Sequence, residues 1–172
     1  MNSKLKTQNL KLAFVALGSN LGDSRRIIQE AMARLQIFSE QPILKSSLWQ
    51  TAPVDCPPGS AMFVNAVVGL EARRDETPES LLEKLRSLEK EFGRQPKIVL
   101  NEPRPLDLDL IVFGEETRNT PELVLPHPRA HLRQFVLQPL SEIAPELVLP
   151  GQGRTVAQLL AVLSSDEVLT RI

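Results

Sequence analysis

The residues of this 172-residue chain that are most clearly suited to binding or catalysis are two aspartates inside an apolar segment. The segment reads Pro103-Arg-Pro-Leu-Asp-Leu-Asp-Leu-Ile-Val-Phe-Gly114, and its composition predicts a strand from Asp107 to Phe113. Side chains alternate along a strand, so Asp107 and Asp109 should point to the same face. Two adjacent carboxylates repel each other unless a cation lies between them. Mg²⁺ prefers carboxylate and phosphate oxygens, so the pair predicts a magnesium site.

The rest of this strand is apolar, and it is therefore expected to be a central strand in a sheet that is covered on both faces. The face opposite the aspartates holds Leu108, Leu110 and Val112, and the aspartate face continues with Ile111 and Phe113. An unpaired buried carboxylate is costly, so each aspartate needs a partner. The alternative to a metal is a structural pair that faces solvent or forms an ion pair with Arg104.

One group of basic residues brackets a proline-rich loop, and a second group lines another. The first group is Arg94, Lys97 and Arg104, and the second is His127, Arg129, His131 and Arg133. Proline restricts the backbone, so these loops should have defined shapes. Cations on both sides of an aspartate pair favour a polyphosphate held by arginine and metal together. The alternative is that each group is an ordinary solvated surface.

An asparagine in the middle of an expected strand indicates a second kind of site. Asn65 lies between Phe63 and Val67, where asparagine is disfavoured unless its amide finds partners. A planar heterocycle with a donor–acceptor edge is one such partner, and Phe63 or Phe135 could stack on its face. Core packing is the alternative for each phenylalanine taken alone.

Other motifs are less specific. The turn from Gly18 to Gly22 follows a strand and opens a helix, but it lacks the Gly-Lys-Ser/Thr ending of a P-loop, so we interpret it as a turn. Cys56 is the only cysteine, which excludes an internal disulfide and fits a reducing, cytoplasmic setting. No nucleophilic triad is indicated.

Composition restricts the class of protein. Hydrophobic residues make up 42%, charged residues 24%, and the net charge is −1, which is typical of a globular protein and not of a nucleic-acid-binding one. The longest apolar run, from Leu12 to Leu17, is too short to cross a membrane. We expect a loose tail over residues 1–11 and a single domain over residues 12–172.

Apolar periodicity predicts the order β-α-β-β-α-β followed by a helical tail. The expected strands cover 12–17, 43–51, 63–71 and 107–113, with a short strand possible at 123–125. Four helices are expected. The first follows Asp23 and runs as far as Phe38, and the second begins at Pro78 and stops at Gly93. The other two cover residues 134–143 and 155–163. This order is typical of an α+β, ferredoxin-like fold with a mainly antiparallel sheet.

Six sequence blocks in this order resemble the 6-hydroxymethyl-7,8-dihydropterin pyrophosphokinase family of folate biosynthesis. They are Ala16-Leu-Gly-Ser-Asn-Leu-Gly22, Phe63-Val-Asn-Ala-Val67, Pro103-Arg-Pro-Leu-Asp-Leu-Asp109, Pro126-His127, Arg133-Gln-Phe135 and Glu142-Ile-Ala-Pro-Glu146. The resemblance covers about Ala13 to Leu163. It implies a three-layer α-β-α arrangement on a ferredoxin-like core, and transfer of the β,γ-diphosphoryl group of ATP to the pterin hydroxymethyl group, with AMP as the other product.

The resemblance also implies roles for individual residues. Asp107 and Asp109 match a pair that binds two Mg²⁺ ions, and Arg94 and Arg104 match catalytic loop arginines that contact the phosphates. The pterin positions are Thr51, Val54, Phe63, Asn65 and Phe135. The ATP positions are Glu89, Leu110, His127 and Arg133. The implied partners are these two small molecules, without nucleic acid or membrane, and the chain is expected to be a cytoplasmic monomer.

The chain departs from the family pattern in two places. Leu100-Asn-Glu102 replaces an Arg-Trp-Gly that is common in the family, and Pro128 replaces a tyrosine. Two other classes were weighed. An RNA-binding module would share the element order but needs paired aromatics on the sheet and a basic surface. A metal-dependent phosphohydrolase would share the aspartate pair but not the set of Phe63, Asn65 and Phe135.

Overall fold

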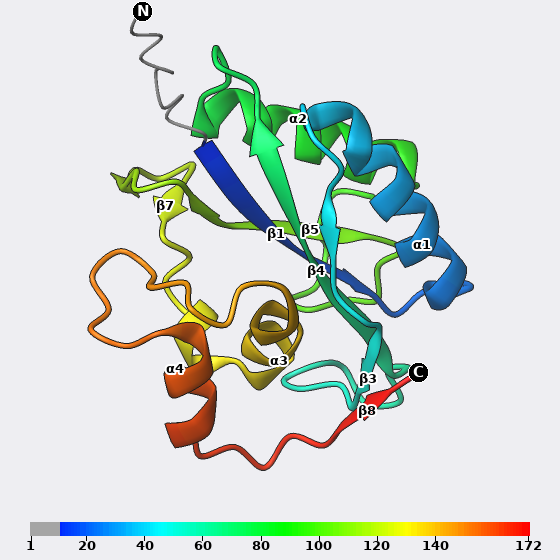
Figure 1. Ribbon diagram of the computed structural model, residues 1–172. Helices are drawn as coiled ribbons and strands as arrows, with labels where there is room; N and C mark the ends of the chain where they lie inside the picture. The colour runs from blue at the N-terminus through cyan, green and yellow to red at the C-terminus, as the bar shows by residue number, and fades with distance from the viewer. Residues whose placement is uncertain (1–10) are drawn as a thin grey trace, which may run out of the picture.

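The computed structural model describes residues 11–172 (Figure 1). Its main sheet has six strands in the order β5-β1-β4-β3-β8, with β2 also paired to β4. The strands are β1 (Lys11–Ser19), β2 (Leu44–Lys45), β3 (Trp49–Thr51), β4 (Phe63–Ala72), β5 (Asp107–Phe113) and β8 (Leu169–Arg171); β6 (Arg118–Asn119) and β7 (Val124–Leu125) form a separate ribbon. The helices are α1 (Ser24–Leu35), α2 (Pro78–Glu91), α3 (Gln134–Ile143) and α4 (Val156–Val162).

Every pairing between neighbouring strands of the main sheet is antiparallel. The chain passes through β1, α1, β3, β4, α2 and β5, so the predicted β-α-β-β-α-β order and the mainly antiparallel α+β fold are confirmed. The central pair is β1 and β4, and the aspartate strand β5 lies beside β1 at one edge, so the prediction that it is a central strand is wrong. Its apolar character on both sides comes from the helices that cover the two faces of the sheet. Of the tail predicted for residues 1–11, Lys11 already belongs to β1 and the rest lies outside the described residues.

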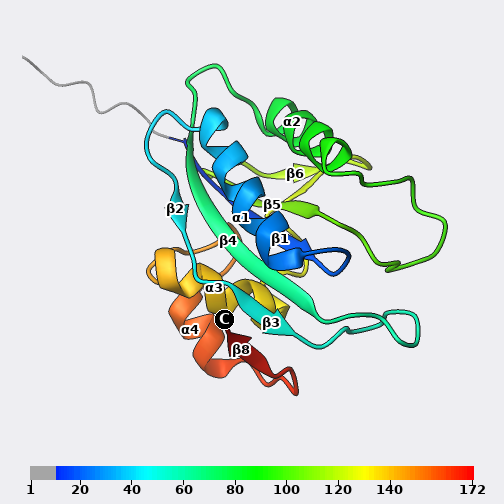
Figure 2. The same ribbon diagram turned by 90° about the vertical axis from the view of Figure 1, so that its right-hand side faces the viewer.

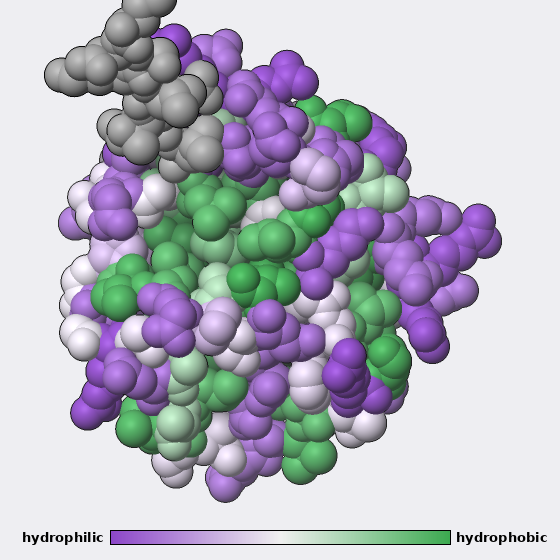
Figure 3. Space-filling model, in the orientation of Figure 1, coloured by the Kyte–Doolittle hydropathy of each residue, from purple (hydrophilic) through white to green (hydrophobic). Residues whose placement is uncertain are grey.

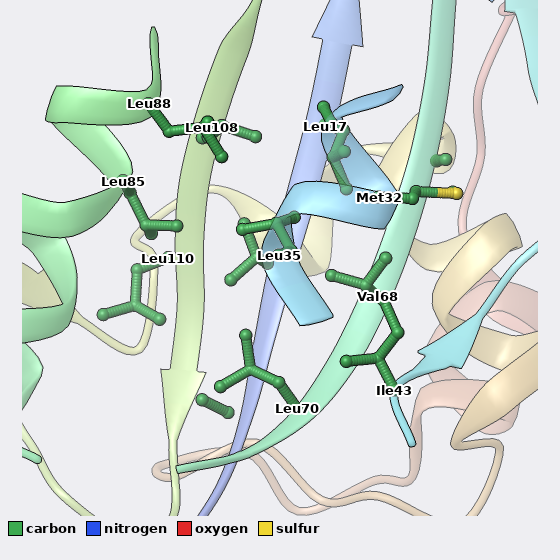
Figure 4. Packing of buried hydrophobic residues seen from close by; sticks show 14 of the residues in the cluster. Leu17, Met32, Leu35, Ile43, Val68, Leu70, Leu85, Leu88, Leu108 and Leu110 are labelled. Carbon is green, nitrogen blue, oxygen red and sulfur yellow. The ribbon is translucent and has the colours of Figure 1, made fainter. Parts of the chain in front are cut away.

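Two layers of helices cover the sheet, one on each face (Figures 1 and 2). Helices α1 and α2 pack on one face through a leucine-rich core, in which Leu35, Leu85 and Leu110 approach one another (Figure 4). Helices α3 and α4 cover the other face, with Val67, Ile111 and Leu137 in a second core. The predicted three-layer arrangement is therefore present, and β4, with eight buried residues out of ten, lies between the layers.

Both main helices on the first face begin as their sequences predict. Asp23 caps α1 by accepting the backbone N–H of Arg26, and Thr77 caps α2 in a capping box with Ser80, with Pro78 at the first helical position. Gly93 follows α2 with a φ of +90°, a left-handed conformation that glycine adopts without strain.

The side-chain alternation predicted for β5 holds as far as Ile111 and is wrong for Val112 and Phe113. Phe14 pairs with Val112 and Val15 pairs with Leu110, so Ile111 has no partner residue on β1. This β-bulge shifts the alternation by one residue. As a result Val112 joins Ile111 in the α3 and α4 core, and Phe113 packs in the α1 and α2 core.

The single strand predicted for residues 43–51 is also wrong, because the structure divides it into β2 and β3. Ser46 lies between them, and its side-chain oxygen accepts the backbone N–H of Val67 at 2.9 Å. A serine side chain that replaces a backbone acceptor interrupts the regular ladder. Strand β8, which pairs with β3 at the far edge, was not predicted.

Three loops meet at one end of the sheet (right-hand side of Figure 2). They are the β1–α1 loop, the β3–β4 loop and the α2–β5 loop. The backbone of Asn20 donates to the Arg104 carbonyl at 3.2 Å, and the Asn20 side chain accepts the Arg104 N–H at 3.0 Å. The Asn101 side chain donates to the Asp55 carbonyl at 2.7 Å. These hydrogen bonds join the loops around the residues that the sequence analysis singled out.

On the face seen in Figure 3, apolar residues gather near the centre and hydrophilic residues dominate the right-hand edge. Among the described residues, none of the helices has the length and apolar character that crossing a membrane requires.

We expect Gly69→Ala to destabilise the fold by about 1–3 kcal/mol, because it overpacks the contact between β1 and β4. A Cβ atom at Gly69 would lie 2.8 Å from Cε1 of Phe14 and 3.3 Å from Cδ1 of Leu44. Urea denaturation measures the loss. Gly153→Ala is the matched control, because no atom lies within 4 Å of its added Cβ. Equal stability of the two variants would contradict the packing argument.

Candidate active site

A cavity of about 480 Å³ opens where the three loops meet. Nine of the predicted site residues line it: Thr51, Val54, Phe63, Asn65, Arg104, Asp107, Asp109, Arg133 and Phe135. These residues come from β3, β4, β5, two loops and the start of α3. The structure therefore brings together, in one cavity, the aspartates, the aromatic residues and two of the arginines.

Asp107 is held by two arginines from the α2–β5 loop. Arg94 forms a close hydrogen bond to Oδ1, and Nε of Arg104 lies 3.1 Å from Oδ2. Burial favours a higher pKa for Asp107, but the charges of Arg104 and Arg94 outweigh it and hold the pKa below its usual value. The ion pair with Arg104 that was the alternative to a metal is present in this structure.

Asp109 has a different environment, although it lies on the same face. Among the described residues, no hydrogen bond or salt bridge reaches its carboxylate. Burial and the neighbouring charge of Asp107 raise the pKa of Asp109 above its usual value. A cation at this position would lower that pKa and relieve the repulsion.

Glu89 lies behind the cavity and supports the aspartate pair from α2. Its Oε1 accepts the backbone N–H of Leu108 at 2.7 Å and the Nη1 of Arg94 at 3.1 Å. The N–H of Leu108 lies on the edge of β5, so Glu89 satisfies a group that has no strand partner there. Burial raises the pKa of Glu89 to about 7, against the effects of Leu108 and Arg94. Glu89, Arg94 and Asp107 thus form one hydrogen-bonded chain.

Asn65 is buried on β4, across β1 from Asp107, and is fixed by its neighbour on β3. Its Nδ2 donates to Oγ1 of Thr51 at 2.8 Å, which directs the amide. A Cβ atom on Gly18, the residue opposite Asn65 on β1, would lie 3.4 Å from Oδ1 of Asn65. Glycine at position 18 therefore leaves room around the Asn65 oxygen, which stays available as an acceptor.

The two phenylalanines reach the cavity from different layers, Phe63 from β4 and Phe135 from α3. Each carries an arginine over its ring. Cζ of Arg104 lies 5.6 Å from the centroid of Phe63, and Cζ of Arg133 lies 5.3 Å from that of Phe135. At these distances a cation interacts favourably with the ring, so both rings present faces that accept a planar, electron-poor group.

The second basic group forms one wall of the cavity through Arg129 and Arg133. The backbone of His127 donates to the Ile111 carbonyl at 2.8 Å, and Nδ1 of His127 accepts the Arg129 N–H at 3.2 Å. Burial and the charge of Arg129 lower the pKa of Arg133, which shows that positive charges are crowded here. An anion would relieve this crowding.

Four predicted residues do not line the cavity: Glu89, Arg94, Leu110 and His127. Glu89 and Arg94 act on it through Asp107. Leu110 is buried in the core under α1 and α2, so its side chain points away from the cavity and only its backbone could meet a nucleotide.

The family resemblance assigned no role to Arg129 or Glu167, which also line the cavity. Arg129 stood in the basic group, where an alternating run of His and Arg was the available signal. Glu167 had no signal, because a single carboxylate near the end of the chain matches no motif.

A cavity that combines arginines, a carboxylate pair and two phenylalanines suits an enzyme that transfers phosphoryl groups to a heterocyclic substrate. The family model for 7,8-dihydro-6-hydroxymethylpterin-pyrophosphokinase (HPPK) matches residues 14–145. The chain belongs to this family, and the prediction from its motifs is confirmed.

Similar proteins occur in bacteria and fungi. The chain is 38% identical over 153 residues to a 2-amino-4-hydroxy-6-hydroxymethyldihydropteridine pyrophosphokinase of Pseudomonas aeruginosa, covering 88% of this chain and 91% of that protein. It is 37% identical over 137 residues to the protein of the same name from Bacillus subtilis, covering 79% and 80%. It is also 35% identical over 159 residues to the folic acid synthesis protein fol1 of Pneumocystis carinii, covering 91% of this chain but 21% of that protein.

Solved structures agree with the fold. The wild-type HPPK-DHPS of Plasmodium falciparum matches with a TM-score of 0.68 and 13% identity, over 88% of this chain and 44% of that chain. The chain thus spans less than half of this structural relative and about a fifth of the fungal protein, whereas it spans most of the bacterial relatives.

We expect His127 to remain neutral at pH 7 with its proton on Nε2. Burial and the charges of Arg133 and Arg129 lower its pKa to about 4. Because the folded pKa is depressed, the contribution of neutral His127 to stability is complete above its usual value of 6.5 and is lost as the pH falls toward 4.

Nitrogen chemical shifts of the imidazole, followed from pH 8 to pH 4, measure this directly. His127→Gln assigns the signal. A midpoint near 6.5 would contradict the buried, positively charged environment.

Proposed function

We propose that this chain transfers the β,γ-diphosphoryl group of ATP to 6-hydroxymethyl-7,8-dihydropterin, giving AMP and the pterin diphosphate, a step of folate biosynthesis. The observation that carries the proposal is that one cavity holds the Asp107 and Asp109 pair together with Asn65 and two phenylalanines, with Asp107 and Asn65 on opposite sides of Gly18 in the sheet. Membership of the pyrophosphokinase family and the names of the bacterial relatives support it.

The pterin is assigned to the end of the cavity that holds Asn65. The Oδ1 of Asn65 accepts from the edge of the heterocycle, because Nδ2 is already engaged by Thr51. Phe63 and Phe135 stack on the ring, and each stacking contact is worth about 1–3 kcal/mol by analogy with nucleic-acid bases. Backbone groups near Thr51 and Val54, which also line the cavity, complete the site.

The ATP phosphates are assigned to the basic end. Arg104 lines the cavity and Arg94 lies behind it on Asp107, so both guanidinium groups are placed to stabilise the charge of the diphosphoryl group, which is the main way that proteins accelerate phosphoryl transfer. Arg133 and the neutral His127 contact the nucleotide, and Leu110 contributes through its backbone. Glu89 accepts a hydrogen bond from Arg94, and so it fixes the position of this guanidinium.

The carboxylate pair fits Mg²⁺. Asp109 is half-buried and carries a raised pKa, and the described residues contain no group of three or more His, Cys, Asp and Glu side chains that could hold a metal by themselves. Mg²⁺ commonly uses one or two carboxylates and takes its other ligands from phosphate and water, which suits this pair. Two ions held by Asp107 and Asp109, when bound, neutralise charge on the transferring group.

We also propose that the chain forms a single domain, that it is a monomer and that it is cytoplasmic. The partners are the two small molecules. A metal-dependent phosphohydrolase is disfavoured, because hydrolysis alone gives no reason for Asn65 and the two phenylalanines to share the cavity of the aspartates.

The nucleotide product tests the reaction. Purified chain with ATP, Mg²⁺ and 6-hydroxymethyl-7,8-dihydropterin should form AMP and pterin diphosphate in equal amounts, measured by chromatography. Without the pterin, AMP should not accumulate. ADP as the main product, or ATP turnover that does not depend on the pterin, would refute the assignment.

We expect Asp109→Asn to lower kcat about 10³-fold, which corresponds to the loss of several kcal/mol of charge stabilisation in the transition state. The substitution keeps the volume of the side chain and removes its charge, so the fold should persist. Rates are measured at saturating Mg²⁺, with Asp75→Asn, an exposed site in the β4–α2 loop, as the matched control. A kcat within a few-fold of the unsubstituted chain would make Asp109 structural.

A further inference from the structure

One of the six sequence blocks, Glu142-Ile-Ala-Pro-Glu146, has no role in the site described above. Its first residue, Glu142, lies in the last turn of α3, the helix whose first turn carries Phe135. The Glu142 carboxylate accepts hydrogen bonds from the segment that leads into β3. Its Oε1 accepts the indole N–H of Trp49 at 2.6 Å. Its Oε2 accepts the hydroxyl of Ser47 at 2.7 Å and the backbone N–H of the same residue at 3.3 Å. Both oxygens of one carboxylate therefore hold one short segment.

This segment borders the part of the sheet that carries Asn65. Trp49 pairs with Asn65 in the register of β3 and β4. Thr51, two residues further along β3, accepts the Nδ2 of Asn65 through Oγ1 at 2.8 Å. Side chains alternate along a strand, so Trp49 and Thr51 point to the same face of the sheet. Glu142 thus holds the strand that directs the Asn65 amide, on the face where Thr51 and Asn65 line the cavity.

The two elements that Glu142 joins are otherwise attached to the molecule in different ways. Helix α3 packs on the sheet through a core that includes Leu137 and Val67 of β4. Strand β3 is three residues long and lies between β4 and β8. Apolar packing is not directional, whereas hydrogen bonds to a charged acceptor are directional and about twice as strong as neutral ones. The carboxylate therefore fixes the position of β3 relative to α3.

The same helix also supplies an aromatic ring to the cavity. Phe135 and Glu142 are seven residues apart, which is two helical turns, and so they lie on one side of α3 about 10 Å apart along its axis. At its start α3 presents Phe135 to the cavity, and near its end it holds β3 through Glu142. The spacing between the Phe135 ring and the Asn65 amide thus depends on how α3 and β3 are joined.

From this arrangement we propose that Glu142 is a positioning residue for the pterin. Through Trp49 and Ser47 it fixes β3 against α3, and this sets the distance between the hydrogen-bonding edge at Asn65 and the ring of Phe135. The proposal rests on the proposed function, because it assumes that the pterin lies between these two residues. Glu142 does not line the cavity, so it acts through β3 and not by touching the substrate.

The hydrogen bond itself can be tested by nuclear magnetic resonance. Trp49 is the only tryptophan of the chain, so a nitrogen–proton correlation spectrum contains a single indole N–H signal. Glu142→Ala should move this signal upfield, because the indole loses a charged acceptor. The measurement needs no substrate, and so it is independent of the proposed function.

The positioning role is tested by titration calorimetry of the pterin, in the presence of Mg²⁺ and an ATP analogue that cannot react. Glu142→Ala should weaken pterin binding about tenfold, the effect of one misplaced hydrogen bond or ring contact. Glu142→Gln should weaken it only about threefold, because the amide keeps one acceptor oxygen. Affinity for the ATP analogue alone should stay within twofold, because the arginines and aspartates are unaltered. A general loss of folding would lower both affinities.

A double-mutant cycle connects the effect to the hydrogen bond. Trp49→Phe keeps an aromatic ring and removes the donor, so it should also weaken pterin binding. The double variant Glu142→Ala/Trp49→Phe should bind the pterin within twofold of Glu142→Ala alone, because both substitutions remove the same contact. Trp49→Phe takes the place of Glu142→Ala if the alanine variant does not fold. Glu146→Ala is the matched control, since Glu146 is an exposed carboxylate of the same block, and it should leave pterin affinity unchanged.

Three results would overturn the inference. The first is a pterin affinity of Glu142→Ala within twofold of that of the unsubstituted chain. The second is an equal loss of pterin and ATP-analogue affinity, which would make Glu142 a residue of general stability. The third is an additive double variant, which would separate Trp49 from Glu142. If the unsubstituted chain itself does not bind the pterin, the proposed function fails instead, so the two failures are distinguishable.

Discussion

Two carboxylates lie side by side on one face of β5, and the rest of the site is arranged around the cost of keeping them there. A buried carboxylate needs a charge or hydrogen-bond partner, and two neighbours of like charge raise that need. Arg94 and Arg104 meet it for Asp107, and Glu89 in turn holds Arg94. Asp109 is left with a raised pKa. The charges at this end of β5 therefore favour a cation beside Asp109 and, through the arginines, an anion in the cavity.

The arginines also connect the charged residues of the cavity with its aromatic rings. Arg104 contacts the carboxylate of Asp107 and lies over the ring of Phe63, and Arg133 lies over the ring of Phe135 in a wall that it shares with Arg129. A guanidinium that turns toward a phosphate must leave at least one of these contacts. The binding of an anion by these arginines and the exposure of the aromatic faces are therefore coupled, because the same side chains take part in both.

The sequence predicted the residues that local chemistry determines. Helix α3 has the predicted bounds, Gln134–Ile143, and Asp23 and Thr77 cap α1 and α2, because caps and apolar periodicity act over a few residues. The bulge at Ile111 and the break at Ser46 were missed, since each depends on a hydrogen bond to a strand that is distant in the sequence. For the same reason the motifs identified the aspartates and Asn65, whereas Glu167 became visible only when β8 paired with β3.

The loops that border the cavity are joined at Asn101, in the stretch where this chain lacks the aromatic residue that is common in the family pattern. The Asn101 side chain donates to the Asp55 carbonyl at 2.7 Å, and both residues have positive φ, at +54° and +51°. Asparagine and aspartate tolerate this conformation better than other side chains, so the turn costs little. An indole could pack against the β3–β4 loop but could not accept this left-handed turn as readily. The hydrogen bond between Asn101 and Asp55 thus joins the α2–β5 loop to the β3–β4 loop beside the cavity, where Leu100 supplies apolar surface.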